Sequence, residues 1–327
     1  MKPALNVFIA LVAAFLAGCN GAAERRSLLT VDFQQDQSLR YKFVSSRDIE
    51  VDWGTVKSGA RRGQQEADKS SESMSMVVAY TPVKVDPYGL TTIKATCESV
   101  KVERSAPKGP QTTKRDAVEN LSGKTFMLAV SPTGKIEDYS QLDKLIEEIG
   151  QKAFRPDRKR GRIKEPDMIS DFIATQWFLW DAVSSIEKAS EGLSVGQSWQ
   201  SKLSVPTPMV MRKARDVIYT LDEIRQSEQG RLAVIRSSYL LAGSVPRNWP
   251  IPYKGRFRMS GKFGFLRGYK VLDLQGKGEE LFNIDKGRME QYNQQYQIQL
   301  EAFMPMGIDV KPLITIDQNL TMTILED

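Results

Sequence analysis

The stretch "LITIDQNLTMTI", residues 313–324, shows the clearest strand pattern in the chain. Its apolar side chains fall on one side of an extended backbone, at Ile314, Ile316, Leu320, Met322 and Ile324. Because successive side chains of a strand point to opposite faces, this spacing gives one apolar and one polar face. The segment therefore predicts a β-strand that packs one face on a core and leaves the other to solvent.

Similar segments lie on both sides of the middle of the chain. They are 39–46, 48–53, 74–80, 90–102, 125–139, 196–205, 216–224, 230–243, 268–276 and 279–303. "SPTG", residues 131–134, has the Ser, Pro and Gly of a type I turn and predicts a hairpin. Residues 54–72 and 105–114 lack an apolar period and are predicted loops. Cys97 shares the apolar face of its strand, which favours a small buried thiol over a reactive one.

Two hexapeptides repeat one pattern. "GKIEDY" (134–139) and "GRMEQY" (287–292) agree at Gly, Glu and Tyr, and each follows an apolar strand and a turn ending in Gly. Glu137 and Glu290 alternate with apolar neighbours, so they belong to the wetter face of a strand and not to a reactive pocket. We interpret the repeat as an internal duplication of a β-unit of about 100 residues, with chance similarity as the alternative.

Two helices are predicted between the strand-rich regions. The first covers 140–154 and has one apolar face, made by Leu142, Leu145, Ile146 and Ile149. Ser140 followed by Asp143 has the spacing of a capping box. The second helix covers 166–189 and carries a broad apolar stripe, which includes Phe172, Trp180 and Val183. We expect this helix to be the main apolar plug against the sheets.

The predicted fold class is α+β: two related antiparallel β-units, packed with two central helices in a curved-sheet or half-barrel architecture. The predicted division of the chain is a signal peptide (1–18), a tether (19–38), a first β-unit (39–139), a helical insert (140–192) and a second β-unit (193–327).

The first nineteen residues indicate export. Lys2 precedes an apolar run over 5–16, and the run ends in "LAGC", residues 16–19. This ending resembles the lipobox of bacterial lipoproteins, which implies cleavage before Cys19 and acyl chains such as palmitate on the mature terminus. We expect a lipid-anchored protein of the bacterial cell envelope that faces the periplasm, and Asn20 favours the outer membrane. An ordinary signal peptide with an incidental Cys is the alternative.

The composition of the chain excludes several kinds of catalytic and metal site. The 327 residues include no His, which excludes a Ser-His-Asp triad, a Cys-His pair and any His-ligated metal site. The net charge of +6 is mild and both signs are spread along the chain, so a nucleic-acid partner is not expected. No acid, base or nucleophile constellation emerges, and we expect neither an enzyme nor a cofactor or metal.

Two segments hold candidate contact residues. Residues 155–164 form a basic run that would contact an anionic surface through Arg155, Arg158, Lys159, Arg160, Arg162 and Lys164, with a solvated loop as the alternative. Aromatic residues of the second helix and of a predicted Phe257–Phe265 strand are candidate lining for a ligand cavity, namely Trp177, Trp180, Phe257, Phe263 and Phe265.

"SVGQSW", residues 194–199, together with the lipobox and the repeated β-unit, resembles an uncharacterised family of bacterial lipoproteins with a domain of unknown function. That family carries a Val-Gly-Asp-x-Trp-like segment, in which Gln197 here replaces the Asp. The resemblance implies no activity. Two hypotheses follow: a non-catalytic binding or structural module that contacts an envelope protein or polymer, or a carrier of an apolar ligand or lipid held between curved sheet and helix.

Overall fold

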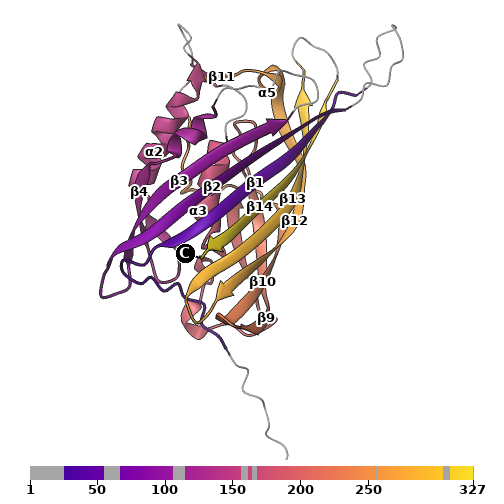
Figure 1. Cartoon of the computed structure of the whole chain (residues 1–327). Helices are drawn as coiled ribbons and strands as arrows, with labels where there is room; N and C mark the ends of the chain where they lie inside the picture. Colours follow the sequence, from indigo (N-terminus) through magenta and orange to yellow (C-terminus); the bar gives the residue numbers. More distant parts are fainter. Residues whose placement is uncertain are drawn as a thin grey trace, which may run out of the picture.

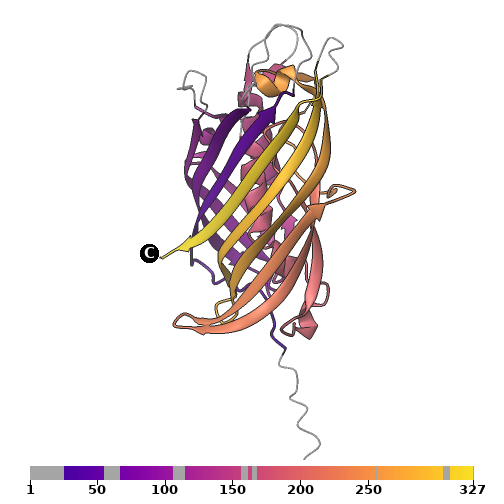
Figure 2. The same cartoon turned by 90° about the vertical axis from the view of Figure 1, so that its right-hand side faces the viewer.

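The computed structural model describes residues 26–54, 67–105, 115–155, 161–163, 168–254, 256–304 and 310–326. Within these residues, eleven strands form one curved antiparallel sheet around the helices (Figures 1 and 2). The sheet is open, because β5 and β8 are edge strands at its two ends. The structure thus confirms a mostly antiparallel sheet with a few helices.

The strands of the large sheet, in chain order, are β1 (Leu39–Asp52), β2 (Asp68–Val85), β3 (Thr91–Ser105), β4 (Thr125–Val130), β5 (Ile136–Asp138), β8 (Ser198–Ser204), β9 (Ala214–Ser227), β10 (Gly230–Leu241), β12 (Arg267–Asn283), β13 (Arg288–Phe303) and β14 (Leu313–Leu325). A three-stranded sheet contains β6 (Phe154–Arg155), β7 (Gly161–Ile163) and β11 (Phe257–Met259). The helical elements are η1 (Ala117–Leu121), α2 (Ser140–Lys152), α3 (Ile169–Phe178), α4 (Asp181–Ser184), η2 (Ala189–Glu191) and α5 (Lys262–Phe265).

The chain builds the sheet from the middle to one edge, and then from the other edge back to the middle. Strands β1 to β5 follow one another outward, and the segment with α2, α3 and α4 then connects to β8 at the opposite edge. The later strands return toward β1 in chain order, and β14 pairs with β1 over thirteen residue pairs, from Arg40↔Leu325 to Asp52↔Leu313. The first and last strands therefore lie side by side in the middle of the sheet (Figure 1).

The core lies between the inner face of the sheet and the helices. The predicted apolar face of β14 is buried at Ile314, Ile316, Leu320 and Met322, and Cys97 of β3 is buried as predicted. The four predicted core residues of α2 are buried too. Helix α3 has buried side chains on nearly all sides, which include Phe172 and Phe178. The prediction that this region plugs the sheet is confirmed for α3 and for Trp180 and Val183.

The predicted helix 166–189 is not continuous. Within the described residues, α3 ends at Phe178 and a separate short α4 begins at Asp181. The break lets two side chains reach different partners. Trp180 packs edge-on against Phe33 and Tyr80, while Asp181 accepts hydrogen bonds from Ser201 and Tyr219. These contacts override the local preference for one long helix.

Four smaller predictions were wrong. Glu290, predicted on the wetter face of its strand, is buried and accepts hydrogen bonds from Asn283 and Arg288, because the register of β12 and β13 shifts beside it. Residues 68–72, predicted as loop, begin β2, because Glu72 is buried beside Arg47 of β1. The predicted Phe257–Phe265 strand is β11 followed by the helical turn α5. The capping box at Ser140 does not form; instead the Asp138 carboxylate accepts a hydrogen bond from the Ser140 backbone N–H at 2.9 Å.

The two hexapeptides occupy hairpins, but they do not continue alike. Tyr139 precedes helix α2, whereas Tyr292 lies inside the long β13, so an internal duplication is not shown. Their glycines nevertheless share a function. Gly134 (φ 82°) and Gly287 (φ 58°) both lie against the N-terminal segment, where a Cβ atom would come within 3.1 Å of Val31 or 2.5 Å of the Asp32 nitrogen.

Candidate binding groove on the outer face of the sheet

A long hollow crosses the face of the sheet that points away from α3. Its volume is about 1040 Å³, and it spans seven neighbouring strands, from β3 through β1 and β14 to β10. Each strand contributes three consecutive residues, of which the middle one faces the core. Because side chains alternate along a strand, the backbone of the middle residue forms the floor and its neighbours form the walls. We call this hollow the outer groove.

Hydroxyl, amide and carboxylate groups dominate the walls of the outer groove. The wall residues are Ser46, Asp48, Ser71, Ser73, Glu103, Ser105, Ser238, Leu240, Gln275, Lys277, Gln295, Gln297, Asp317 and Asn319. Most of these side chains both donate and accept hydrogen bonds or accept only, which suits a polar ligand.

The floor of the groove is one continuous row of paired residues. Across the sheet the direct partners are Arg104, Glu72, Arg47, Gln318, Tyr296, Gly276 and Tyr239, in that order. Apart from Gly276, which has no side chain, these residues point inward, and we call the seven of them the polar row. Gly276 is required by packing, since a Cβ atom there would lie 2.4 Å from the Cβ of Tyr296 and 2.3 Å from the Gln295 carbonyl oxygen.

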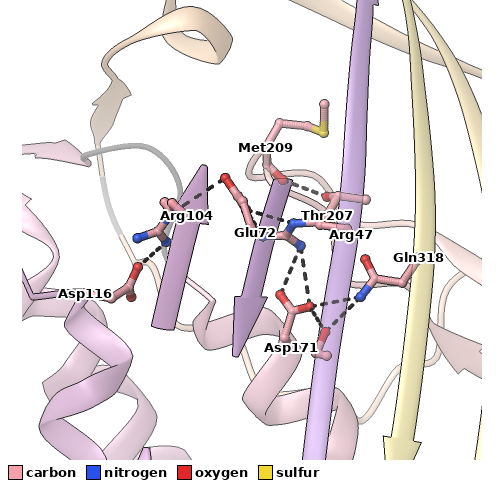
Figure 3. A network of polar contacts seen from close by, with 9 residues as sticks. Arg47, Glu72, Arg104, Asp116, Asp171, Thr207, Met209 and Gln318 are labelled. Carbon is pink, nitrogen blue, oxygen red and sulfur yellow. Dashed lines mark hydrogen bonds and ion pairs between the residues drawn. The ribbon is translucent and has the colours of Figure 1, made fainter. Parts of the chain in front are cut away.

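Arg47 is the centre of a buried network that ties α3 to the sheet (Figure 3). Its Nε donates to Glu72 at 2.9 Å, and its Nη1 donates to Asp171 of α3 at 3.1 Å. Asp171 also accepts from Ser45 at 2.6 Å. Burial lowers the pKa of Arg47, but the two carboxylates more than compensate and keep it above its usual range. The guanidinium stays charged, as a buried ion pair requires.

The network continues to η1 at one end of the row. Arg104 forms ion pairs with Glu72 at 3.7 Å and with Asp116. Asp116 caps η1 by accepting from the Val118 backbone N–H, while Glu119 accepts from the Asp116 backbone N–H. This capping box fixes the first turn, so the end of the polar row is fixed to a defined piece of backbone.

A second buried cluster lies behind the other end of the row. The guanidinium of Arg215 lies over the rings of Phe178, Tyr239 and Tyr296, with 4.0–4.7 Å to the ring centroids. It donates to Gln294 at 2.5 Å, and Gln294 donates to Glu280 at 3.0 Å. Burial raises the pKa of Glu280 to about 8, so this carboxyl is mainly protonated at neutral pH. Burial likewise raises the pKa of Asp181 to about 6.

The outer groove carries a pair of carboxylates at its middle. Asp48 of β1 and Asp317 of β14 are direct cross-strand partners, and both face outward. Like charges in this position repel each other across a sheet. Gln297 donates one hydrogen bond to Asp317 at 2.8 Å, and Glu103 forms an ion pair with Lys101. Because Lys101 neutralises Glu103, the charged wall residues that remain are Asp48, Asp317 and the cation Lys277. The wall therefore carries an excess of one negative charge, which is concentrated at the Asp48–Asp317 pair.

The five predicted cavity residues are not brought together, and none lines the outer groove. Trp180 packs on Phe33, Trp177 packs on Tyr139 and Trp249, and Phe257 packs on Phe154. Phe263 is buried, whereas Phe265 is exposed.

Most of the other predicted contact residues lie outside the described residues. These are Cys19, Arg158, Lys159, Arg160 and Lys164. The backbone of Arg155 belongs to β6, and Arg162 is exposed on β7.

The wall residues of the groove were not singled out from the sequence, although one signal was present. Asp48 falls on the polar face of a predicted strand, together with Glu50 and Asp52. The alternation gives the face of each residue, but the register between β1 and β14 is needed to bring Asp48 opposite Asp317.

Comparisons with known proteins give no family. No family model matches the chain, and no curated protein matches it. One similar solved structure is that of lipovitellin, described as showing lipid–protein interactions, with a TM-score of 0.42 and 8% identity. The match covers 90% of this chain and 26% of that one, so the chain spans about a quarter of its length. Similarity at this level carries no argument about function.

The described residues contain no helix that is long and apolar enough to cross a membrane. The same part of the chain contains no group of three or more His, Cys, Asp or Glu residues arranged to hold a metal ion.

Proposed function

We propose that the protein is a non-catalytic binding module of the cell envelope, whose outer groove holds an extended basic segment of another protein. The observation that supports this is the groove itself, a large hollow whose floor and walls come from seven strands and whose middle holds the Asp48–Asp317 carboxylate pair. The strands form the most extensively paired part of the fold, so the groove is a preorganised surface.

The length of the groove suits an extended chain. Six gaps between seven strands, at about 4.8 Å each, give a span of about 29 Å. An extended polypeptide advances about 3.3 Å per residue, so about nine residues would fit along it. Ser and amide side chains along both walls would pair with the backbone N–H and C=O groups of such a segment.

Charge selects a basic segment over an acidic one. The Asp48–Asp317 pair repels itself in the free protein, and a Lys or Arg side chain between the two would relieve that repulsion. Exposed charge pairs of this kind contribute about 0.2–1 kcal/mol each, so two or three of them would bias specificity without giving tight binding alone.

Anchoring in the envelope is part of the proposal and is supported by the lipobox sequence "LAGC". Two or more acyl chains on the mature terminus would hold the protein durably on a membrane, because each buried CH₂ contributes about 0.8 kcal/mol. Labelled palmitate should enter the wild-type protein and should be absent from Cys19→Ser. Palmitate in that variant would contradict anchoring at Cys19.

The groove is tested with two labelled peptides of about nine residues, one alternating Lys with Ser and one alternating Glu with Ser. Fluorescence anisotropy should show binding of the Lys peptide only, and the binding should weaken as salt rises. The double variant Asp48→Asn/Asp317→Asn should bind the Lys peptide about tenfold more weakly, which corresponds to ~1.4 kcal/mol. The control is Asp273→Asn/Glu279→Gln, which removes two exposed carboxylates of β12 outside the groove.

Three outcomes would contradict the groove proposal. They are equal binding of both peptides, no binding of either, and equal losses in the test and control variants. The carrier hypothesis has its own readout, mass spectrometry of molecules that co-purify with the full chain. An apolar ligand found there, together with no peptide binding, would favour the carrier.

A further inference from the structure

The chain enters the described fold across one end of the sheet. Ser27 exchanges backbone hydrogen bonds with Leu193, Val31 donates to the Pro132 carbonyl at 2.8 Å, and Asp32 donates to the Gly287 carbonyl at 2.9 Å. Leu29, Val31 and Phe33 are buried beneath these contacts. Residues 26–33, the entry segment, are thus fixed against the turns of the β4–β5 and β12–β13 hairpins.

The turn between β2 and β3 lies at the same end. A Cβ atom on Gly89 of this turn would come within 2.6 Å of Pro132, the residue that the entry segment contacts. Asp86 holds the turn rigid, because its carboxylate accepts from the backbone N–H groups of Tyr88 at 2.8 Å and Leu90 at 2.9 Å. We call residues 85–90 the tip.

Apolar side chains protrude from this end although the core is close by. Tyr88 at the tip is 89% exposed, and Leu28 of the entry segment and Val195 beyond Leu193 are each 52% exposed. Leu28 points outward between the buried residues Ser27 and Leu29, so its exposure follows from the fixed path of the segment. A Tyr side chain has an apolar ring and a polar hydroxyl, and Tyr is enriched at membrane–water interfaces for that reason.

The length of chain before the entry segment indicates which surface meets this end. Cys19 precedes Arg26 by seven residues, which reach at most about 25 Å when fully extended. If Cys19 is acylated, the entry end faces the bilayer at short range. This step rests on the anchoring part of the proposed function, whereas the exposed side chains and the fixed path do not.

We propose that the entry end docks on the lipid surface, with Tyr88 and Leu28 inserted into the headgroup region. Insertion then holds the strands at a steep angle to the bilayer and places the outer groove, which crosses the strands, roughly along it. The opposite end carries exposed aromatic residues too, Phe265 and Phe303, and so provides a matched control.

The test uses the full chain on vesicles of phosphatidylcholine, with an environment-sensitive dye on Pro87→Cys or, at the opposite end, on Lys311→Cys. Cys97 is buried and its pKa is raised to about 12, so it does not compete for the dye. Cys19 is the other cysteine of the chain, and it is replaced by Ser wherever the protein carries no palmitate, so that only the introduced thiol is labelled. On vesicles, the dye at residue 87 should shift to shorter wavelength and be quenched by brominated lipid. The dye at residue 311 should do neither.

Substitution then identifies the inserted side chains. In the Pro87→Cys background, Tyr88→Ala should lower the ratio of inserted to free tip about tenfold, the factor that corresponds to ~1.4 kcal/mol of lost apolar burial. Phe265→Ala should leave the dye unchanged. Tyr88 is exposed, so the urea midpoint should not move, and an unchanged midpoint shows that the variant folds.

The outcomes separate docking from anchoring. An unshifted dye at residue 87 in protein that carries palmitate overturns docking and leaves the anchor intact. Equal shifts at residues 87 and 311, or an equal response to Tyr88→Ala and Phe265→Ala, also overturn docking. A shift at residue 87 that depends on Tyr88 supports docking, and it does so even where palmitate is not incorporated and the anchor proposal has failed.

Discussion

At the polar row, the inner and outer faces of the sheet share one backbone but differ in how their charges are paired. On the inner face, Arg47 is fully buried and contacts two carboxylates, and one of these, Asp171, also accepts hydrogen bonds from Ser45 and Gln318. On the outer face, the adjacent residue Asp48 lies opposite another acid, Asp317. The difference shows that burial forces pairing, because an unpaired charge in the core is costly, whereas a solvated face tolerates repulsion and keeps groups free for a ligand.

The largest expected effect concerns a buried acid that is kept neutral. The pKa of Glu280 is raised by burial from 4.5 to about 8, so the folded state binds its proton more tightly than the unfolded state. The contribution of neutral Glu280 is complete below about pH 4.5 and is lost as pH rises through 8. The difference between these two pKa values corresponds to a loss of unfolding free energy on the order of 5 kcal/mol.

Urea unfolding at a series of pH values tests this prediction. The wild type should lose stability between pH 4.5 and 8, and Glu280→Gln should flatten that part of the profile. A profile that is the same in both proteins would show that Glu280 titrates normally.

Removing the charge of Arg47, at the centre of the inner face, should lower the free energy of unfolding by about 3–5 kcal/mol. Arg47→Met leaves Asp171 buried without its cation and Glu72 with only the longer ion pair to Arg104, which is strongly destabilising. The matched control is Arg40→Met, since Arg40 forms its ion pair with Glu98 at a partly exposed site of the same strand. A loss below about 1 kcal/mol in Arg47→Met, the range of exposed pairs, would contradict the buried network.

Adding one methyl group at Gly276 tests how closely β12 and β13 pack at the polar row. Gly276→Ala places a Cβ atom 2.3 Å from the Gln295 carbonyl and should destabilise the fold by about 1–3 kcal/mol, as overpacking does. Gly243→Ala is the control, because nothing lies within 4 Å of its Cβ position. Equal unfolding midpoints for the two variants would show that the row has room at Gly276.

The smallest expected effect is on the outer face and has the opposite sign. Asp48→Asn removes a like-charge pair and should stabilise the fold by about 0.2–1 kcal/mol at low salt. The gain should shrink as salt rises, because exposed charges are screened. A loss of stability would indicate that Asp48 has a favourable partner in the free protein, and it would weaken the case for cation binding at the Asp48–Asp317 pair.

The faces of single strands were predictable from the sequence, and their neighbours were not. Alternation placed Ile314 and Ile316 inward, and the same parity puts Gln318 inward, next to Ser45 and the buried Asp171. What no local pattern contains is the pairing of β1 with β14, which joins residues more than 250 positions apart. The outer groove and the polar row both depend on that pairing, so neither was predicted.

The prediction of one continuous helix over 166–189 was wrong for a related reason. Residues 166–189 carry an apolar stripe that local rules extend through Leu179 and Trp180. The chain turns there because Asp181 accepts hydrogen bonds from Ser201 and Tyr219, which belong to strands beyond the insert. The family-like segment 194–199 is held by similar contacts, since Gln197 accepts from Ser194 and Gly196 donates to Leu221.

The adjacency of β1 and β14 also governs how the chain must fold. During synthesis β1 emerges early, yet its partner on one side is the last strand of the protein. Until β14 arrives, one edge of β1 has unpaired backbone groups, which is the feature that drives strand-to-strand aggregation. Closing a loop of this length is also slow, because fold formation slows as contacts become more distant in sequence. A partly synthesised chain therefore exposes the unpaired edge of β1 to other strands until β14 is available.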